Sequence, residues 1–586
     1  MPPIVPRRAM RAALLAFTAF AAISHADAQG ASTTDPRAAL KSGWKDAGEA
    51  ALNLRVVSTA WKPAGMYDPA NLGNFAFLNS DLAFSGTYVF QGNFNGIQVW
   101  DASDVTQLRL TTLVTCPGGQ GDVSVHGTLL FMSVEETRGR ADCGPGGVQD
   151  TVSAERFRGV RIFDISDIEH PRIITQVQTC RGSHTHTLLE DPKDKGVVYI
   201  YVQGTSVVRS PNELGGCSRL RPEQDANSSL FRIEVIRVPL ASPKDAKVIS
   251  TPRIFADSAG AIAGLWKGGA HGEGTQNTSE TNQCHDITVY PAIGLAAGAC
   301  SGNGIILDIR DPANPRRIAE VMDPNFAYWH SANFSNDGSK VLFTDEWGGG
   351  TAPRCRVTDK MTWGADAIFA LKGRTMTLGG YYKLPVAQTA SENCVAHNGS
   401  IIPVPGRDIM AQGWYQGGVS VFDFTDPAHV QEIAYFDRGP VSADTLHTGG
   451  SWAAYWHNAY LYSTEIARGL DVLELTPSAF LSANEIAAAG LVRHEVNNPQ
   501  TQMQNTWPAQ AVVARAYLDQ LARNKGLSAA RTTAIGAAID AAEQATGAAR
   551  KAAYGKLAAT LAADAKSAGD AVRVKALAAV VGQLAK

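Results

Sequence analysis

The chain has 586 residues and a formal net charge of −3, and 45% of its residues are hydrophobic while 18% are charged. This balance is typical of a globular protein with a large core and excludes a chain that stays unfolded. Its charge is dispersed and it contains no recognition motif, so nucleic acid is excluded as a partner.

The first residues have the pattern of a secretory signal peptide. Arg7, Arg8 and Arg11 come before the apolar run AALLAFTAFAAI, and the sequence ADA ends at Ala28. We expect residues 1–28 to be removed, the mature chain to start near Gln29, and the protein to be periplasmic or secreted. The run has 12 residues, and no later segment reaches the roughly 20 that span a bilayer, so no transmembrane segment is expected after cleavage.

Eight cysteines in an exported chain indicate disulfide bonds, because the compartment is oxidising and the number is even. Sequence alone does not fix the connectivity. Ligation of a metal by cysteine is the alternative, and the absence of any CxxC pair disfavours it. Pairing of nearest neighbours predicts four disulfides, namely Cys116 with Cys143, Cys180 with Cys217, Cys284 with Cys300, and Cys355 with Cys394.

After an N-terminal segment of residues 29–50, a strand-like motif repeats along residues 51–480. Each copy is an alternating apolar strand that ends in a polar turn, with a further strand after it. The spacing of about 50 to 70 residues fits propeller blades of four strands with insertions. The copies are GIQVWDASD at Gly96, GVRIFDISD at Gly159, GIILDIRDP at Gly304, GVSVFDFTDP at Gly418 and GLDVLELTP at Gly469, with degenerate copies at Ile233 and Asp366. These seven units predict a mainly β fold, a seven-bladed β-propeller.

The composition changes after Trp507 and Pro508. Residues 481–507 are expected to be a linker, and residues 508–586 an Ala-rich α-helical bundle, because apolar residues recur there at helical spacing. From residue 509 on there are 11 basic and 5 acidic residues. A basic bundle could dock on an anionic envelope surface or on its own propeller, or the charges could form a solvated face.

The glycine-led strand followed by FDISD or FDFTDP resembles the LVIVD-repeat proteins, a family of mostly exported bacterial propellers. The stretch GGSWAAYWHNAYLYSTEIARGLDVLEL, residues 449–475, is similar to the last blade of that family. The resemblance covers roughly residues 50 to 480 and implies a propeller fold, whereas the family is largely uncharacterised in function. A more distant resemblance is to the selenium-binding protein and methanethiol oxidase propellers, which implies histidines that hold copper in the central channel.

Four histidines occupy one equivalent position at the start of the first strand in four successive blades. They are His184, His285, His330 and His397. First strands line the axial channel, so these side chains are expected to converge. His186 lies two residues after His184 on the same strand face and is a further candidate ligand. Imidazoles without a cysteine pair favour copper or iron as the cofactor, with zinc less favoured.

Carboxylates near these strands are candidates to orient the rings or to contact a polar substrate. Asp286 follows His285, while Glu135, Glu346 and Glu465 align with one another in SVEE, TDEW and STEI. The alternative is that these glutamates bond neighbouring backbone groups.

Two classes of function remain open. If the histidines bind metal, the chain is an exported oxidoreductase acting on a small-molecule substrate, with catalytic residues unknown. If they belong to a structural hydrogen-bond network, the propeller is a non-catalytic module that binds a protein or glycan at the cell envelope. No serine-hydrolase elbow, P-loop or dinucleotide fingerprint can be placed on a strand-turn-helix, which disfavours those enzymes.

Overall fold

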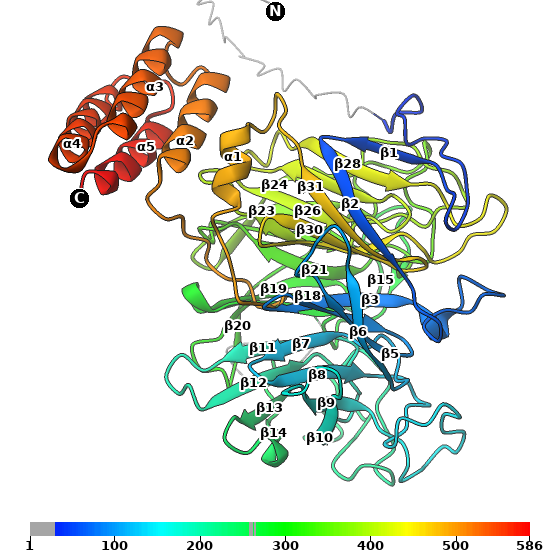
Figure 1. Cartoon of the computed structure of the whole chain (residues 1–586). Coiled ribbons are helices and arrows are strands. Elements are labelled where there is room, and N and C mark those ends of the chain that lie inside the picture. Colours follow the sequence, from blue (N-terminus) through cyan, green and yellow to red (C-terminus); the bar gives the residue numbers. More distant parts are fainter. Residues whose placement is uncertain (1–29, 257–261, 263–264) are drawn as a thin grey trace, which may run out of the picture.

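The computed structural model describes residues 30–256, 262 and 265–586 (Figure 1). The predicted signal peptide, residues 1–28, and the predicted mature start at Gln29 lie outside the described residues. The protein is mainly β, with a helical domain at its C-terminal end. Among the helices of the described part, none is long and apolar enough to cross a membrane.

Most strands belong to antiparallel sheets of consecutive strands. Four of these sheets have four strands each: β7 (Val123–His126), β8 (Leu129–Val134), β9 (Gly159–Asp164) and β10 (Arg172–Gln178); β11 (His186–Glu190), β12 (Val197–Val202), β13 (Glu234–Pro239) and β14 (Lys247–Ser250); β17 (Asp286–Tyr290), β18 (Leu295–Cys300), β19 (Asn303–Asp308) and β20 (Arg316–Val321); β21 (Trp329–Phe334), β22 (Lys340–Asp345), β23 (Asp366–Lys372) and β24 (Thr375–Tyr382). A fifth sheet contains β3 (Asn79–Ser85), β4 (Tyr88–Asn93), β5 (Gly96–Asp101) and β6 (Arg109–Thr115), with the short strand β32 (Val496–Asn497) added beside β3.

A nine-stranded sheet contains two further meanders, joined by parallel pairing of β25 with β29. Its strands are β1 (Glu49–Leu52), β2 (Leu54–Trp61), β25 (Asn398–Ile402), β26 (Ile409–Gly413), β27 (Val419–Asp423), β28 (Gln431–Arg438), β29 (Ser451–His457), β30 (Tyr460–Glu465) and β31 (Gly469–Leu475). Strand β2, from the N-terminal end, pairs antiparallel with β31, with Leu54 opposite Leu475. Strands from the two ends of the β domain therefore pair in one sheet.

The first strands of these meanders contact one another in a closed circle. Their order is β3, β7, β11, β17, β21, β25, β29 and again β3. Such a ring of radial sheets is a β-propeller, and it has few exposed edges. Second strands such as β12, VVYIYV, are buried along their whole length, because sheets cover both of their faces. Outer strands such as β6 alternate between exposed and partly buried residues.

The aspartates of the repeated turns have a structural role. The carboxylates of Asp101, Asp164 and Asp423 each accept a hydrogen bond from the backbone N–H two residues later, at 2.8 to 2.9 Å. This Asx-turn lets the chain reverse after the third strand of each meander without losing a backbone partner.

Residues 495–507, which we call the strap, run across the first strands. Strand β32 pairs with Phe84 and Ser85 of β3. The amide groups of Asn498 and Gln502 each bond both the N–H and the C=O of one residue, Val125 and Phe334 respectively. The strap thus supplies hydrogen-bond partners for backbone groups at the edges of first strands, which closure of the ring leaves unpaired.

The helical domain packs against one side of the propeller (Figure 1). Its helices are α1 (Ala483–Ala489), α2 (Ala511–Arg523), α3 (Ala529–Gln544), α4 (Gly547–Asp564) and α5 (Ala571–Leu584). Helix α1 begins with a capping box formed by Ser482 and Glu485. The fully buried carboxylate of Glu485 also accepts hydrogen bonds from Arg407 of the propeller and Arg523 of α2. This carboxylate ties the two domains together.

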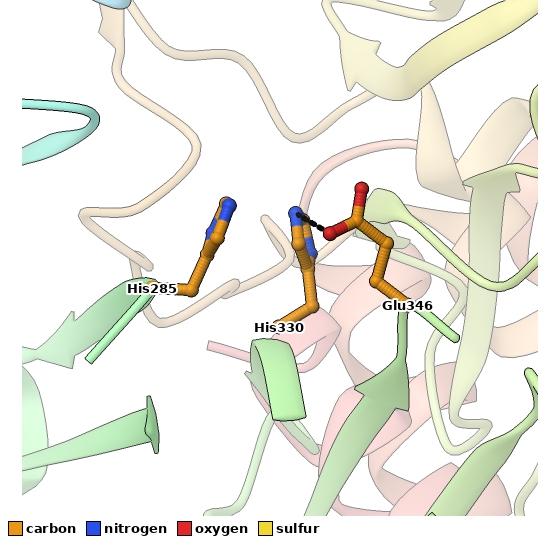
Figure 2. A group of neighbouring side chains, drawn as sticks. All are labelled: His285, His330 and Glu346. Carbon is orange, nitrogen blue, oxygen red and sulfur yellow. Dashed lines mark ion pairs between the residues drawn. The ribbon is translucent and has the colours of Figure 1, made fainter. Parts of the chain in front are cut away.

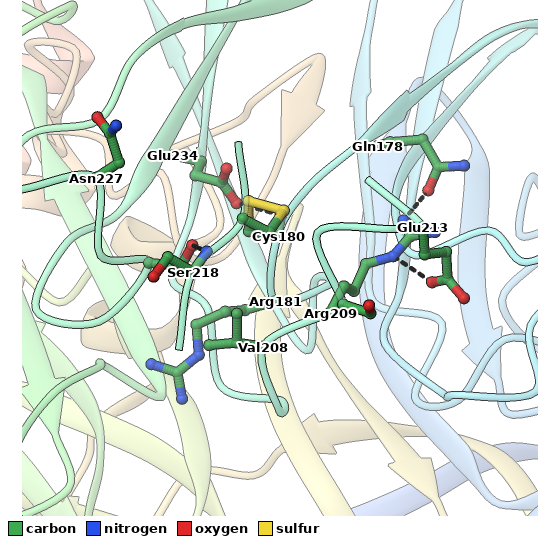
Figure 3. Close-up of a disulfide and its surroundings, with 12 residues drawn as sticks. Gln178, Cys180, Arg181, Val208, Arg209, Glu213, Ser218, Asn227 and Glu234 are labelled. Atoms are coloured by element: carbon green, nitrogen blue, oxygen red, sulfur yellow. Dashed lines mark hydrogen bonds and ion pairs between the residues drawn. A yellow bond between two sulfur atoms is a disulfide. The ribbon is translucent and has the colours of Figure 1, made fainter. Parts of the chain in front are cut away.

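Four disulfides are present, and they are the nearest-neighbour pairs expected from the sequence: Cys116–Cys143, Cys180–Cys217, Cys284–Cys300 and Cys355–Cys394. Figure 3 shows the disulfide of Cys180, where the carboxylate of Glu234 accepts a hydrogen bond of 2.8 Å from the Cys180 N–H. The disulfide Cys284–Cys300 ties the residue directly before His285 to the end of β18. Four disulfides are consistent with an oxidising, extracellular location.

Short elements complete the described fold. They are the 3₁₀ helices η1 (Phe75–Phe77), η2 (Pro243–Asp245) and η3 (Pro291–Ile293), and a two-stranded hairpin of β15 (Gly269–Ala270) and β16 (Asn277–Thr278).

Candidate metal centre

The histidines at equivalent strand starts come together at one end of the axial channel. His285 and His397 directly precede the first strands β17 and β25, and His184 lies two residues before β11. His330 is the second residue of β21. Ring centroids of successive histidines lie 4.4 Å apart for His184 and His285, 3.9 Å for His285 and His330, and 4.1 Å for His330 and His397. Residues more than 200 positions apart in the sequence are therefore neighbours.

His184 and His285 point their Nε2 atoms at each other. These atoms are 2.7 Å apart. The Nδ1 atom of His184 lies 2.7 Å from a carboxylate oxygen of Glu135, and that of His285 lies 3.1 Å from Asp286. A carboxylate accepts a hydrogen bond from Nδ1–H, and the lone pair of the neutral ring is then on Nε2. Two lone pairs then face each other at 2.7 Å, an arrangement that a shared cation or proton must stabilise.

His330 and His397 carry ring nitrogens that the surrounding protein leaves free. His397 donates from Nδ1 to the carbonyl of Trp452 at 2.5 Å, which places its lone pair on Nε2. Within the described residues, this Nε2 atom and both ring nitrogens of His330 have no protein hydrogen-bond partner, although both side chains are fully buried. A buried polar group without a partner costs about 1–3 kcal/mol, so these nitrogens are expected to meet a ligand.

Glu346 faces the same two rings. One of its carboxylate oxygens is 3.8 Å from His330 Nε2 (Figure 2). The other is 3.6 Å from His397 Nε2. Donor atoms of His285, His330 and Glu346 all lie within 4.8 Å of one another. The Tyr415 hydroxyl donates a hydrogen bond to Glu346, and burial raises the pKa of this carboxyl to about 7. Glu346 is placed to bind an ion directly or to orient the rings that do.

The protonation states suit metal ligation, which needs neutral imidazole. Burial lowers the pKa of His285 and His330 well below the usual value, and lowers that of His397 to about 3. Burial also acts to lower the pKa of His184, but the nearby Glu135 carboxylate outweighs it and the pKa is raised. Three of the four rings are therefore neutral at pH 7, and the fourth pairs with Glu135 while no cation is present.

Two of the residues predicted for the site do not join it. His186 is saturated by its own neighbours, because its ring nitrogens each lie 2.7 Å from a serine hydroxyl, those of Ser133 and Ser124. Glu465 accepts hydrogen bonds from the Arg468 guanidinium at 2.9 Å and the Gly450 N–H at 2.8 Å. Glu135, Glu346 and Asp286 do face the histidines.

A cavity of about 380 Å³ opens over the histidines. Its described lining includes His184, His285, Glu135 and Glu346, together with aromatic residues that the sequence analysis missed. One of these, Tyr415, comes after β26 at nearly the position that Glu346 takes after β22 and Glu135 after β8. An alignment of every residue at the end of the second strands, and not of glutamates alone, would have found Tyr415.

The comparisons with known proteins do not identify the chain. No protein-family model matches it, and no curated protein matches it. Among solved structures, the β-propeller domain of Cps50 (Swd1) from Myceliophteria thermophila is 11% identical, with a TM-score of 0.39, and covers 72% of this chain and 100% of that one. Hydrazine synthase from Kuenenia stuttgartiensis is 12% identical, with a TM-score of 0.39 over 65% of this chain and 90% of that one. At such scores the assignment of a propeller rests on the closed circle of first strands.

Proposed function

We propose that this protein is an exported, seven-bladed propeller that binds one copper or iron ion through histidines in its axial channel and acts as an oxidoreductase on a small molecule. The observation that carries the proposal is the pair of Nε2 atoms of His184 and His285, which are 2.7 Å apart while both Nδ1 atoms face carboxylates. One ion bound to both lone pairs would take the place of the proton that must otherwise lie between the two nitrogens.

A metal-free hydrogen-bond network explains the geometry less well. In such a network each histidine needs a donor or an acceptor for both nitrogens, as His186 has with its two serines. His330 lacks both among the described residues, and His397 lacks one. The four rings also lie in sequence around the axis, each on a different meander, which favours a shared ligand over four separate structural roles.

The setting favours a reactive centre over a structural one. Structural zinc sites are closed by local loops, whereas these ligands are held by separate meanders of a ring, and two of them, His184 and His285, line a cavity of about 380 Å³. A bound copper or iron ion would supply redox chemistry with coordination positions open to oxygen or substrate. The protein would supply the four imidazoles, with Glu135 and Asp286 fixing the tautomers of His184 and His285, and with Tyr415 fixing the Glu346 carboxyl.

Seven blades follow if the nine-stranded sheet counts as two, divided where β25 and β29 pair in parallel. The LVIVD-type repeats and the signal peptide, with a periplasmic or secreted location, belong to the same proposal. Four disulfides support that location.

Elemental analysis tests the proposal. The exported form is stripped of loosely bound ions, and its metal content is compared with that of a His285→Ala/His330→Ala double variant. The control variant is His429→Ala, because this exposed histidine contacts Asp426 at the surface. Copper or iron near one per chain in parent and control, and lost in the double variant, is the expected result. Absence of metal from all three would favour the binding module for envelope protein or glycan.

A further inference from the structure

The cavity over the histidines has a chemical character of its own, and we use it to infer the class of substrate. The inference rests on the proposed function for its chemistry, although binding in the cavity can be measured without metal. The volume of about 380 Å³ lies in the range of small-molecule sites, and His184 and His285 form part of the wall.

Aromatic side chains make up much of that wall. They are Phe75, Phe94, Tyr328, Tyr415 and Trp452, and Leu78 lies beside them. Phe75 belongs to the 3₁₀ helix η1 and is 53% exposed, although large apolar side chains are usually covered. Aromatic walls bind flat rings by offset or edge-to-face packing. An exposed phenylalanine at the wall of a cavity is suited to cover one face of such a ring.

The charges of the wall select against anions. Among the described residues that line the cavity there is no lysine or arginine, while Glu135 and Glu346 contribute carboxyl groups. A carboxylate or phosphate on the substrate would lose its hydration without gaining a free opposite charge, because the imidazole of His184 already pairs with Glu135 at 2.7 Å.

Uncharged polar groups complete the wall: Thr205, Gln276, Thr351 and Thr448. The Thr205 hydroxyl and the indole N–H of Trp452 are buried and have no protein partner within the described chain. Groups of this kind bond a hydroxyl or carbonyl group, and buried polar atoms normally find such a partner.

The cavity also continues outward. A second cavity of about 600 Å³ shares Phe75, Phe94 and Glu135 with the first. Glycines 144, 146 and 147 form part of its wall. A substrate longer than one ring could therefore extend from the histidines past Phe75 and Phe94.

We propose that this cavity binds an uncharged aromatic molecule that carries a hydroxyl or carbonyl group. The aromatic wall packs against the ring, the threonine and indole groups bond the polar substituent, and the carboxyl groups exclude acids. His184 and His285, which form part of the wall, then lie next to the bound ring.

Equilibrium binding of three probes of matched shape tests this class of substrate: 2-naphthol, which is uncharged and aromatic, 2-naphthoate, which adds a negative charge, and decahydro-2-naphthol, which lacks aromatic rings. The titrations use calorimetry on the metal-free full chain, where no ion attracts the carboxylate. We expect 2-naphthol to bind at least about tenfold more tightly than either of the others. Equal or tighter binding of 2-naphthoate, or no measurable binding of any probe, would overturn the inference.

Two variants place the binding in this cavity. Phe75→Ala removes an exposed wall residue and is expected to weaken 2-naphthol about three- to tenfold, the usual value of one aromatic pair. Thr205→Val keeps the side-chain shape and removes the hydroxyl, so it should weaken 2-naphthol and decahydro-2-naphthol alike, because both carry the hydroxyl, and leave the preference for the aromatic probe unchanged. Leu378→Ala, at an exposed position on β24, is the control and should change nothing. Equal losses in Phe75→Ala and Leu378→Ala would refute the location.

The results separate this inference from the proposed metal centre. Metal in the parent protein without probe binding refutes the substrate class and leaves the centre in place. If the chain binds 2-naphthol but the parent protein contains no copper or iron in the elemental analysis, the centre is refuted and the cavity stands as a binding site for aromatic molecules.

Discussion

Replacing His330 by leucine should make the metal-free protein more stable. The His330 side chain is fully buried, and in the described structure its two ring nitrogens have no protein hydrogen-bond partner. Leaving a buried polar group unsatisfied costs about 1–3 kcal/mol, and leucine of similar size removes that cost while adding apolar contacts. We therefore expect the free energy of unfolding to rise by about 1–3 kcal/mol in His330→Leu when a chelator is present.

The matched control is His186→Leu. His186 is equally buried but bonds the hydroxyls of Ser124 and Ser133 at 2.7 Å each, and both serines are buried. Its loss leaves the Ser124 hydroxyl without its partner, whereas Ser133 keeps a hydrogen bond of 2.9 Å to the Ser183 hydroxyl, so stability should fall by about 1–3 kcal/mol. Denaturant unfolding followed by tryptophan fluorescence measures both variants. Destabilisation of His330→Leu to the same extent as His186→Leu, without metal, would show that His330 has a structural role and refute the reasoning.

Three further outcomes are expected. Copper or iron at about 100 times its dissociation constant should stabilise the parent by about 2.7 kcal/mol, and the gain should vanish in His285→Ala; a gain of the same size in both proteins would place the ion elsewhere. Gln502→Leu removes both hydrogen bonds to the backbone of Phe334 and should lower the free energy of unfolding by about 2–4 kcal/mol. Gln504→Ala, at an exposed position in the same strap, should lower it little, and equal losses would show that these hydrogen bonds do not stabilise the fold. Burial acts to raise the pKa of Glu485, but Arg523 and Arg407 outweigh it and hold the pKa below its ordinary value of 4.5. This carboxylate therefore stabilises the fold above that pH, and the contribution is lost as pH falls through the lowered pKa. Glu485→Gln should flatten this acid dependence of the unfolding free energy, and an unchanged slope would contradict the assignment.

Sequence periodicity predicted the propeller because every unit repeats the same pattern of buried strand positions followed by a polar turn. Strands such as GIQVWD and GVRIFD alternate or run apolar according to their place in the sheet, and the Asp of each turn bonds local backbone. These are short-range signals. The pairing of β2 with β31 leaves no such signal, because it joins residues more than 400 positions apart.

The histidines could be predicted for a related reason. Equivalent positions in successive units meet at one level of the axis, so alignment of the repeats alone predicts that His184, His285, His330 and His397 lie together. Repeat position does not reveal side-chain partners. His186 follows His184 on the same strand, but serines from the neighbouring meander bond both of its ring nitrogens. Glu465 is on an equivalent strand, but its carboxylate bonds the Arg468 guanidinium.

The strap shows a second limit. Its sequence EVNNPQTQMQN is polar and lacks periodicity, which is typical of a linker. Its order comes from amide side chains that bond the backbone of strands far away in the sequence, for example Asn498 with Val125. No local pattern encodes that complementarity.

A crystal structure of the copper- or iron-loaded protein, with anomalous scattering recorded at the edge of the metal, tests the shared ligation most directly. One anomalous peak is predicted in the axial channel, within about 2.1 Å of Nε2 atoms from at least three of His184, His285, His330 and His397. A loaded protein with no peak among these four rings, or with its metal bound at another place, would contradict the ligation of one ion by neighbouring repeats.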